Sequence, residues 1–177
     1  MNPMNNYYQV TVHIERMNEY GTQKKVPEQY LVQAPSFGAA ERAIVEEIAQ
    51  YATGELEVVA VARRNYSEII TDKFGIASHV DGEVRKMLGQ KNASAEADKW
   101  FKCKLNFITL DEKTGKEKKS ARFFLVNANT AMTAHELVDN FMAGSISDYE
   151  VQQIDETKIL DVYILSTPEN VELAHKP

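Results

Sequence analysis

Basic side chains and an aromatic ring gather in residues 99–122, which hold eight basic residues against three acidic ones, a local net charge of +5. Trp100, Lys102 and Lys104 recur at every second position, which places them on one face of a strand. A sheet face with rings between lysines suits single-stranded nucleic acid, because rings stack on bases and lysines contact phosphates. We therefore expect a nucleic-acid-binding face formed by Trp100, Lys102, Lys104, Lys116, Lys118, Lys119, Arg122 and, in an earlier equivalent stretch, Lys24 and Lys25.

The same residues also have purely structural explanations. Trp100, Phe123 and Leu125 can pack against another sheet face within the chain, or they can form a homodimer interface with lysines at its rim. Lysine-rich hairpin tips also protect sheet edges without binding anything. The sequence leaves these alternatives open.

Patterns required for catalysis or metal binding are scarce. The four histidines (His13, His79, His135 and His175) form no closely spaced pair, and a single cysteine cannot build a zinc knuckle. No glycine-rich phosphate loop or nucleophile elbow occurs. Cys103 shares its strand direction with Phe101 and Leu105, which predicts a buried, unreactive thiol. We expect a non-enzymatic protein with no catalytic residues, metal or cofactor.

An internal repeat organises the chain. Residues 7–14 (YYQVTVHI) match 100–107 (WFKCKLNF) at an offset of 93, and Glu57-Val58 matches Glu150-Val151 at the same offset. Between these segments the offset is 94: Lys24-Lys25 matches Lys118-Lys119, and residues 30–34 (YLVQA) match 124–128 (FLVNA). The constant order and offset favour a tandem duplication.

Periodicity predicts the same elements in each copy. Residues 7–15 alternate between apolar and polar side chains, as do residues 100–107, which is typical of a strand with one covered face. Ser36 and Thr130 are suitable N-caps for a helix in each copy. We predict an α+β protein of two β-β-α-β repeats, with antiparallel sheets each covered by one helix in a pseudo-two-fold arrangement, and a short further strand left open. The expected return strands are 28–34 and 121–128, the closing strands are 56–63 and 149–154, and an edge segment is 159–165.

The domain boundaries follow from this repeat. We expect repeat one at 1–70, a linker or insertion at 71–99, repeat two at 100–167 and a C-terminal tail at 168–177. The linker is rich in small and polar residues, and a short helix over Glu83–Leu88 is compatible with its pattern. A connection this long is either a plain linker or a partner-binding segment.

Composition limits the class of protein. The chain has 177 residues, a net charge of −6 and one cysteine, which suits a reducing compartment. No apolar run approaches the ~20 residues of a membrane span, so we expect a cytoplasmic protein without membrane association. The charge is unevenly spread, because residues 123–177 carry nine acids against two bases.

Several motifs are distinctive together: Asn65-Tyr66-Ser67-Glu68-Ile69, the stretch Ala97–Leu105, Phe107–Glu112 and Asp161-Val162-Tyr163. With them the sequence resembles a family of uncharacterised proteins from Bacteroidetes and their phages and mobile elements. The resemblance covers both repeats and implies a bacterial or phage setting, without catalytic residues to carry over. The 71–99 segment is longer than the acidic join of family members.

The leading hypothesis is a non-enzymatic accessory protein that binds nucleic acid through a sheet face and the basic hairpin. The expected ligand is a single strand. Two alternatives remain. One is a protein that sequesters a small ligand or nucleotide at a site between the repeats or between subunits. The other is a protein-interaction adaptor that docks through the acidic residues 123–177.

Overall fold

The computed structural model describes residues 6–71 and 99–164. Within it the chain forms two compact units, one from residues 1–65 together with 158–177 and the other from residues 66–157. Residues 72–98 of the linker expected at 71–99, the helix expected at Glu83–Leu88 and the tail expected at 168–177 lie outside the described residues, while Lys99 is the first residue of a strand.

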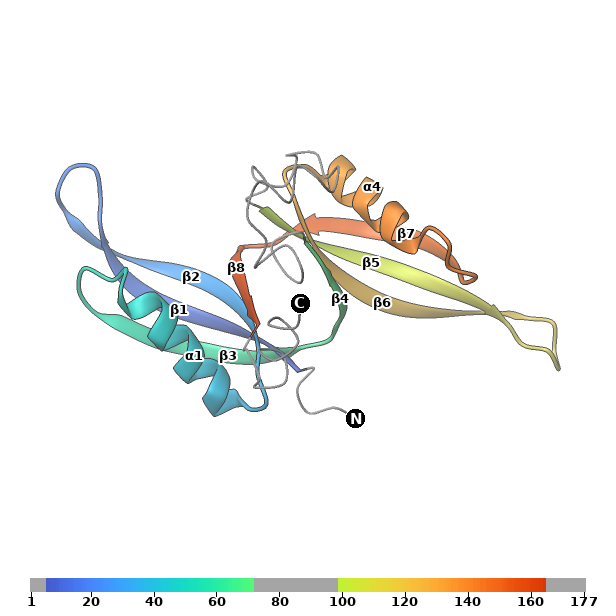
Figure 1. Cartoon of the computed structure of the whole chain (residues 1–177), viewed down its shortest axis with the longest axis horizontal. Coiled ribbons are helices and arrows are strands. Elements are labelled where there is room, and N and C mark those ends of the chain that lie inside the picture. The colour runs from blue at the N-terminus through green and yellow to red at the C-terminus, as the bar shows by residue number, and fades with distance from the viewer. Residues whose placement is uncertain (1–5, 72–98, 165–177) are drawn as a thin grey trace, which may run out of the picture. The chain divides into compact units, whose positions relative to one another are not determined.

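The first unit is a four-stranded sheet with one helix (Figure 1). The strands lie in the order β3-β1-β2-β8, and α1 contacts β1, β2 and β3. The elements are β1 Tyr7–Met17, β2 Gln23–Gln33, α1 Phe37–Ala49, β3 Leu56–Arg64 and β8 Ile159–Ile164.

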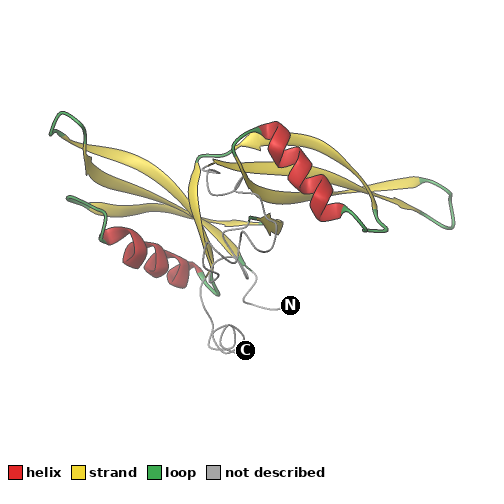
Figure 2. Ribbon diagram, turned by 45° about the horizontal axis from the view of Figure 1, so that its top comes forward, coloured by secondary structure: helices red, strands yellow, loops and turns green. Residues whose placement is uncertain are grey.

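The second unit repeats this plan with the strand order β4-β6-β5-β7 and the helix α4. Figure 2 shows one helix beside each sheet. Its elements are β4 Tyr66–Ile70, β5 Lys99–Leu110, β6 Glu117–Ala128, α4 Ala131–Met142 and β7 Asp148–Glu156. The predicted α+β class is confirmed, with two four-stranded sheets and two helices in the part of the chain that is described.

In each sheet, one of the two edge strands comes from the other half of the sequence: β8 in the first sheet and β4 in the second. β4 follows β3 directly in the chain, yet it pairs with β6; β8 follows β7, yet it pairs with β2. Both of these pairings are parallel. The expectation of wholly antiparallel sheets is therefore wrong at one edge of each sheet, and the compact units do not coincide with segments 1–70 and 100–167.

The two sheets share the same irregularities at the repeat spacing. The ladder between β1 and β3 slips between Thr11 and Val12, and the ladder between β5 and β7 slips between Lys104 and Leu105, 93 residues later. The helices begin alike: Ser36 accepts a hydrogen bond from the backbone N–H of Ala39, and Thr130 accepts one from Thr133. Both N-caps are therefore as predicted.

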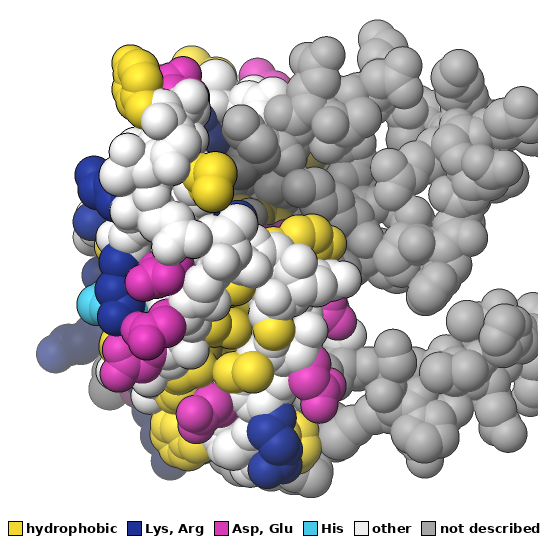
Figure 3. Space-filling model, turned by 90° about the vertical axis from the view of Figure 1, so that its left-hand side faces the viewer, with side chains coloured by type: hydrophobic (Ala, Val, Ile, Leu, Met, Phe, Trp, Pro, Cys, Tyr) yellow, Lys and Arg dark blue, Asp and Glu magenta, His cyan; other side chains and the backbone are white. Residues whose placement is uncertain are grey.

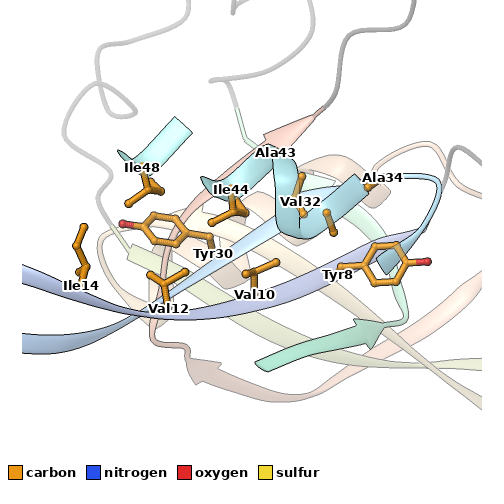
Figure 4. Packing of buried hydrophobic residues seen from close by; sticks show 11 residues of the cluster. Tyr8, Val10, Val12, Ile14, Tyr30, Val32, Ala34, Ala43, Ile44 and Ile48 are labelled. Atoms are coloured by element: carbon orange, nitrogen blue, oxygen red, sulfur yellow. The ribbon is translucent and has the colours of Figure 1, made fainter. Parts of the chain in front are cut away.

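Each helix covers an alternating apolar face of its sheet. In the first unit Val10, Val12 and Ile14 of β1 point towards Ile44 and Ile48 of α1, and all five are at most 2% exposed (Figure 4). In the second unit the corresponding core consists of Phe101, Cys103, Leu105, Phe124, Val126, Ala128, Ala134, Val138 and Met142. Burying each large apolar side chain stabilises the fold by about 1.5–3 kcal/mol.

The exchanged strand β8 provides a test of this topology. Val162 lies opposite Leu31 of β2 and is 2% exposed, whereas Leu160 on the same strand is 51% exposed. We predict that Val162→Asp lowers the free energy of unfolding by about 3 kcal/mol or more, because it buries an unpaired charge, while Leu160→Asp changes it little. Urea unfolding measures the stability. Hydrogen exchange must show lost protection in β2, and unchanged protection there would contradict the pairing.

Candidate nucleic-acid interface

One side of the second sheet brings together a ring and several of the predicted lysines. β5 directs Phe101, Cys103 and Leu105 towards α4, so the alternate residues Lys102 and Lys104 lie on the side away from the helix. The β5–β6 register places Lys104 opposite Phe123 and Ile108 opposite Lys119. Lys102, Lys104, Lys119 and Phe123 therefore share this side, which we call the far face.

Phe123 is the aromatic group that the far face offers. Its side chain is half-buried, and the Nζ atom of Lys102 lies 4.6 Å from the centroid of its ring. Among the described residues no carboxylate lies within 4.0 Å of the Nζ atom of Lys102 or Lys104. The far face thus combines a ring with two ammonium groups that are not neutralised by an ion pair.

Trp100 lies on the same side of β5 as Lys102 and Lys104, as the alternation predicted, but it is not exposed there. Its side chain is 0% exposed, and the backbone carbonyl of Trp100 accepts hydrogen bonds from the N–H and hydroxyl of Thr157 at 2.8 and 2.7 Å. A ring without exposed surface cannot stack on a base. The stacking role expected for Trp100 therefore does not fit this structure, and Phe123 is the half-buried ring beside the lysines.

The remaining basic residues of residues 99–122 do not join the far face. Lys118 and Arg122 lie opposite Thr109 and Leu105, which puts them on the helix side of the sheet. The guanidinium of Arg122 stands 4.7 Å from the ring centroid of Phe107. Lys116 lies in the turn, where its carbonyl accepts a hydrogen bond from Asp111. Alternate residues of a strand lie on opposite sides of the sheet. The net charge of a sequence segment is therefore divided between two faces.

Lys25 and Lys119, which the repeat aligns, form equivalent ion pairs. The Nζ atom of Lys25 lies 3.8 Å from a carboxylate oxygen of Glu57, and that of Lys119 lies 3.1 Å from Glu150. Hydrogen bonds from Lys119 and then from Asn106 lower the pKa of Glu150. The recurrence of these lysines therefore has a structural reason: each links the second strand of its hairpin to the strand on the other side of the central one.

Among the described residues of the first unit, both basic and acidic side chains lie near the lysines. Lys24 lies opposite Arg16 in the β1–β2 ladder, and Lys25 has Glu55 and Glu57 within 4.0 Å. On the end of the first unit seen in Figure 3, basic, acidic and hydrophobic side chains are interspersed. Its ion pairs therefore make Lys25 a weaker phosphate ligand than Lys102 and Lys104.

A buried polar cluster in the first unit was not anticipated. Glu28 is 9% exposed and accepts hydrogen bonds from both Arg16 and the hydroxyl of Tyr30, with Nη2 of Arg16 at 3.0 Å. Burial opposes ionisation of Glu28, but the hydrogen bonds from Arg16 and Tyr30 outweigh it and lower its pKa. A signal was present in the sequence, because Arg16 and Glu28 occupy positions where the alternation places buried side chains.

This cluster predicts a pH-dependent contribution to stability. Because the folded pKa of Glu28 is lowered, its stabilisation is complete above its ordinary pKa of about 4.3 and is lost as the pH falls through the folded value. We predict that Glu28→Gln lowers the free energy of unfolding by about 1–3 kcal/mol at pH 7 and that its difference from the parent disappears towards pH 3. Urea unfolding across pH measures this. Glu19→Gln, on an exposed turn residue, is the control, and a deficit independent of pH would contradict the assignment.

Cys103 is buried, as predicted. Burial raises its pKa to about 11, and the charge of Asp155 adds to the shift. Because the thiolate is the reactive form, this thiol is poorly suited to nucleophilic chemistry. We predict that iodoacetamide at pH 7.5 labels native Cys103 at least roughly 100-fold more slowly than the urea-unfolded chain, as followed by intact mass. Equal rates would show that the thiol is accessible in the folded protein.

The described residues assemble no metal centre, because no three His, Cys, Asp or Glu side chains come together in them. A groove of about 370 Å³ lies within the first unit between α1 and β8, and its polar lining consists of Arg42, Glu46, Glu47 and Tyr163. None of the helices described is long and apolar enough to cross a membrane.

The fold and these surfaces define an α+β protein with two helix-backed, four-stranded sheets, whose clearest polar feature is a lysine–aromatic sheet face. The chain belongs to the family of domains of unknown function designated DUF4494, whose model matches residues 6–165. That match begins at the start of β1 and ends just past β8, so it includes every described strand. No curated protein matches the sequence.

Proposed function

We propose that this protein is a non-enzymatic accessory protein of a bacterium or phage that binds single-stranded nucleic acid on the far face of the second sheet. The observation that carries the proposal is the half-buried ring of Phe123, with the ammonium of Lys102 4.6 Å from its centroid and Lys104 directly opposite in the register. Among the described residues, no carboxylate lies within 4.0 Å of the Nζ atom of either lysine. Phe123 would stack on a base while Lys102 and Lys104 contact phosphates.

The geometry favours a single strand over a duplex. Phe123 is supplied by the middle of a sheet, since β6 is flanked by β4 and β5, and a ring on such a surface reaches only a base whose face is not stacked in a helix. The charge distribution along the chain also favours this region as the binding site. Residues 99–122 carry +5 within a chain of net charge −6, and Lys102, Lys104 and Lys119 of this segment lie on the far face, so phosphates are attracted towards this hairpin.

The groove of the first unit supports the nucleotide-sequestering alternative less well. Arg42 is its one cationic lining residue, and Glu46 and Glu47 line it too. Two carboxylates repel a phosphate group at the distance where one guanidinium would bind it. The geometry therefore favours the far face.

We further propose that the chain arose by tandem duplication of a β-β-α-β unit followed by one exchanged strand. The support is the shared slip in both ladders, the equivalent N-caps and the equivalent ion pairs of Lys25 and Lys119. The pseudo-two-fold relation between the copies stays a prediction.

Binding to a fluorescent single-stranded oligonucleotide tests the proposed function. We predict that Phe123→Leu weakens binding by about 1–3 kcal/mol without changing the salt dependence, because an apolar side chain replaces the stacking ring. Lys104→Gln should weaken binding and also reduce the slope of log K against log salt by roughly 0.7, the effect of one lost phosphate contact on a single strand. Fluorescence anisotropy at several salt concentrations measures both quantities.

Lys118→Gln is the matched control, since Lys118 is an exposed lysine of the same hairpin on the helix side of the sheet. It should reduce affinity less than Lys104→Gln does. Thermal melts establish that each variant is folded. If the folded parent binds no oligonucleotide at low salt, the proposed function is wrong; if Lys118→Gln and Lys104→Gln have equal effects, the far face is not the site.

A further inference from the structure

β3 is an edge strand of its sheet, and the side chains at its centre are apolar. Its described partner is β1 on one side, and no strand pairs with its other side among the described residues. The run Val58-Val59-Ala60-Val61-Ala62 has no charged or polar side chain. Val59 is 43% exposed and Ala60 is also exposed. Such an edge presents unpaired backbone N–H and C=O groups that favour the addition of another strand.

The second unit supplies an internal comparison. β7 is the terminal strand at the same place in the second sheet, with the same slip in its ladder. Its central residues are Val151-Gln152-Gln153-Ile154-Asp155, followed by Glu156. Polar and charged side chains of this kind are how proteins prevent pairing at sheet edges. Both strands have the same slip, so the difference between the two edges lies in their side chains.

The charges at the two ends of β3 indicate what would pair with it. Glu57 lies at the start of the strand, and Arg63 and Arg64 lie at its end. Each guanidinium donates a hydrogen bond to a neutral amide, Arg63 to Asn6 and Arg64 to Gln9. No described carboxylate lies within 4.0 Å of either arginine. Two copies of β3 paired antiparallel around Ala60 would bring Glu57 of each copy, which also lies 3.8 Å from Lys25 of its own chain, close to Arg64 of the other copy, because the register with β1 places Glu57 and Arg64 on the same side of the sheet.

We propose that β3 is a dimerisation edge, where a second copy of this chain adds its own β3 in antiparallel orientation. The pairing is isologous, so residues near the middle of the strand, around Ala60, lie near the two-fold axis and meet their own copies. The apolar run supplies the centre of the interface, and the pair between Glu57 and Arg64 fixes the direction. A single strand pair buries little surface, so the dimer dissociates at roughly micromolar concentration.

Sedimentation equilibrium of the full-length chain across concentration tests the proposal. The expected mass rises from 20.0 kDa to twice that value. Ala60→Lys should raise the dimer dissociation constant by at least roughly tenfold, because like charges would face each other near the axis. Gln153→Lys, at the equivalent position of β7, is the matched control and should leave dimerisation unchanged.

Cross-linking gives a second readout. Because Cys103 is buried, a cysteine introduced by Ala60→Cys becomes the accessible thiol among the described residues, and mild oxidation should yield a disulfide-linked dimer, whereas Gln153→Cys should not. A chain that stays at 20.0 kDa up to about 200 μM, well above the dissociation constant expected for so small an interface, would overturn the proposal. So would a dimer that Ala60→Lys leaves intact, or equal losses in Ala60→Lys and Gln153→Lys.

Discussion

Backbone hydrogen bonding at the outer edges of β2 and β6 is the constraint on which the rest of the structure depends. Each of these strands has its hairpin partner on one side and needs a strand on the other. The chain supplies both from a distance, since β8 pairs with β2 and β4 pairs with β6. As a result the second unit, residues 66–157, is contiguous in sequence, and the first unit is closed only when residues 158–164 return to it.

The two units have the same arrangement of strands and helix but different side chains at equivalent positions. Where the first unit has Glu28, buried between Arg16 and Tyr30, the second has Arg122 over the ring of Phe107. The edge strand β3 has apolar side chains at its centre, whereas the corresponding edge strand β7 has polar ones. The far face carries the cluster of Lys102, Lys104 and Phe123 in the second unit. The two units share sheet register and helix packing but differ at several equivalent positions, and the two proposed binding surfaces lie at positions of this kind.

Local pattern was sufficient to predict much of the fold, and tertiary placement accounts for what it missed. Alternation in β1 and β5 and the N-caps Ser36 and Thr130 depend on neighbouring residues, and the structure has them as predicted. The partner of β8 depends on a sheet edge more than a hundred residues away, which no local period encodes. The alternation of β5 did place Lys102 and Lys104 on one side. It contained nothing to show that Trp100 is fully buried and Phe123 only half-buried, because burial on that side depends on what packs there.

The most direct measurement of the strand exchange compares two fragments of this chain, residues 66–157 and residues 99–164. The first is the contiguous second unit with β4 in place, and the second is the sequence repeat, which replaces β4 by β8. Circular dichroism melts with sedimentation velocity would report folding and mass. The account predicts that 66–157 is a monomer that unfolds cooperatively, whereas 99–164 is unfolded or dimerises by exchanging its last strand. A stably folded monomer of 99–164, together with an unfolded 66–157, would contradict it.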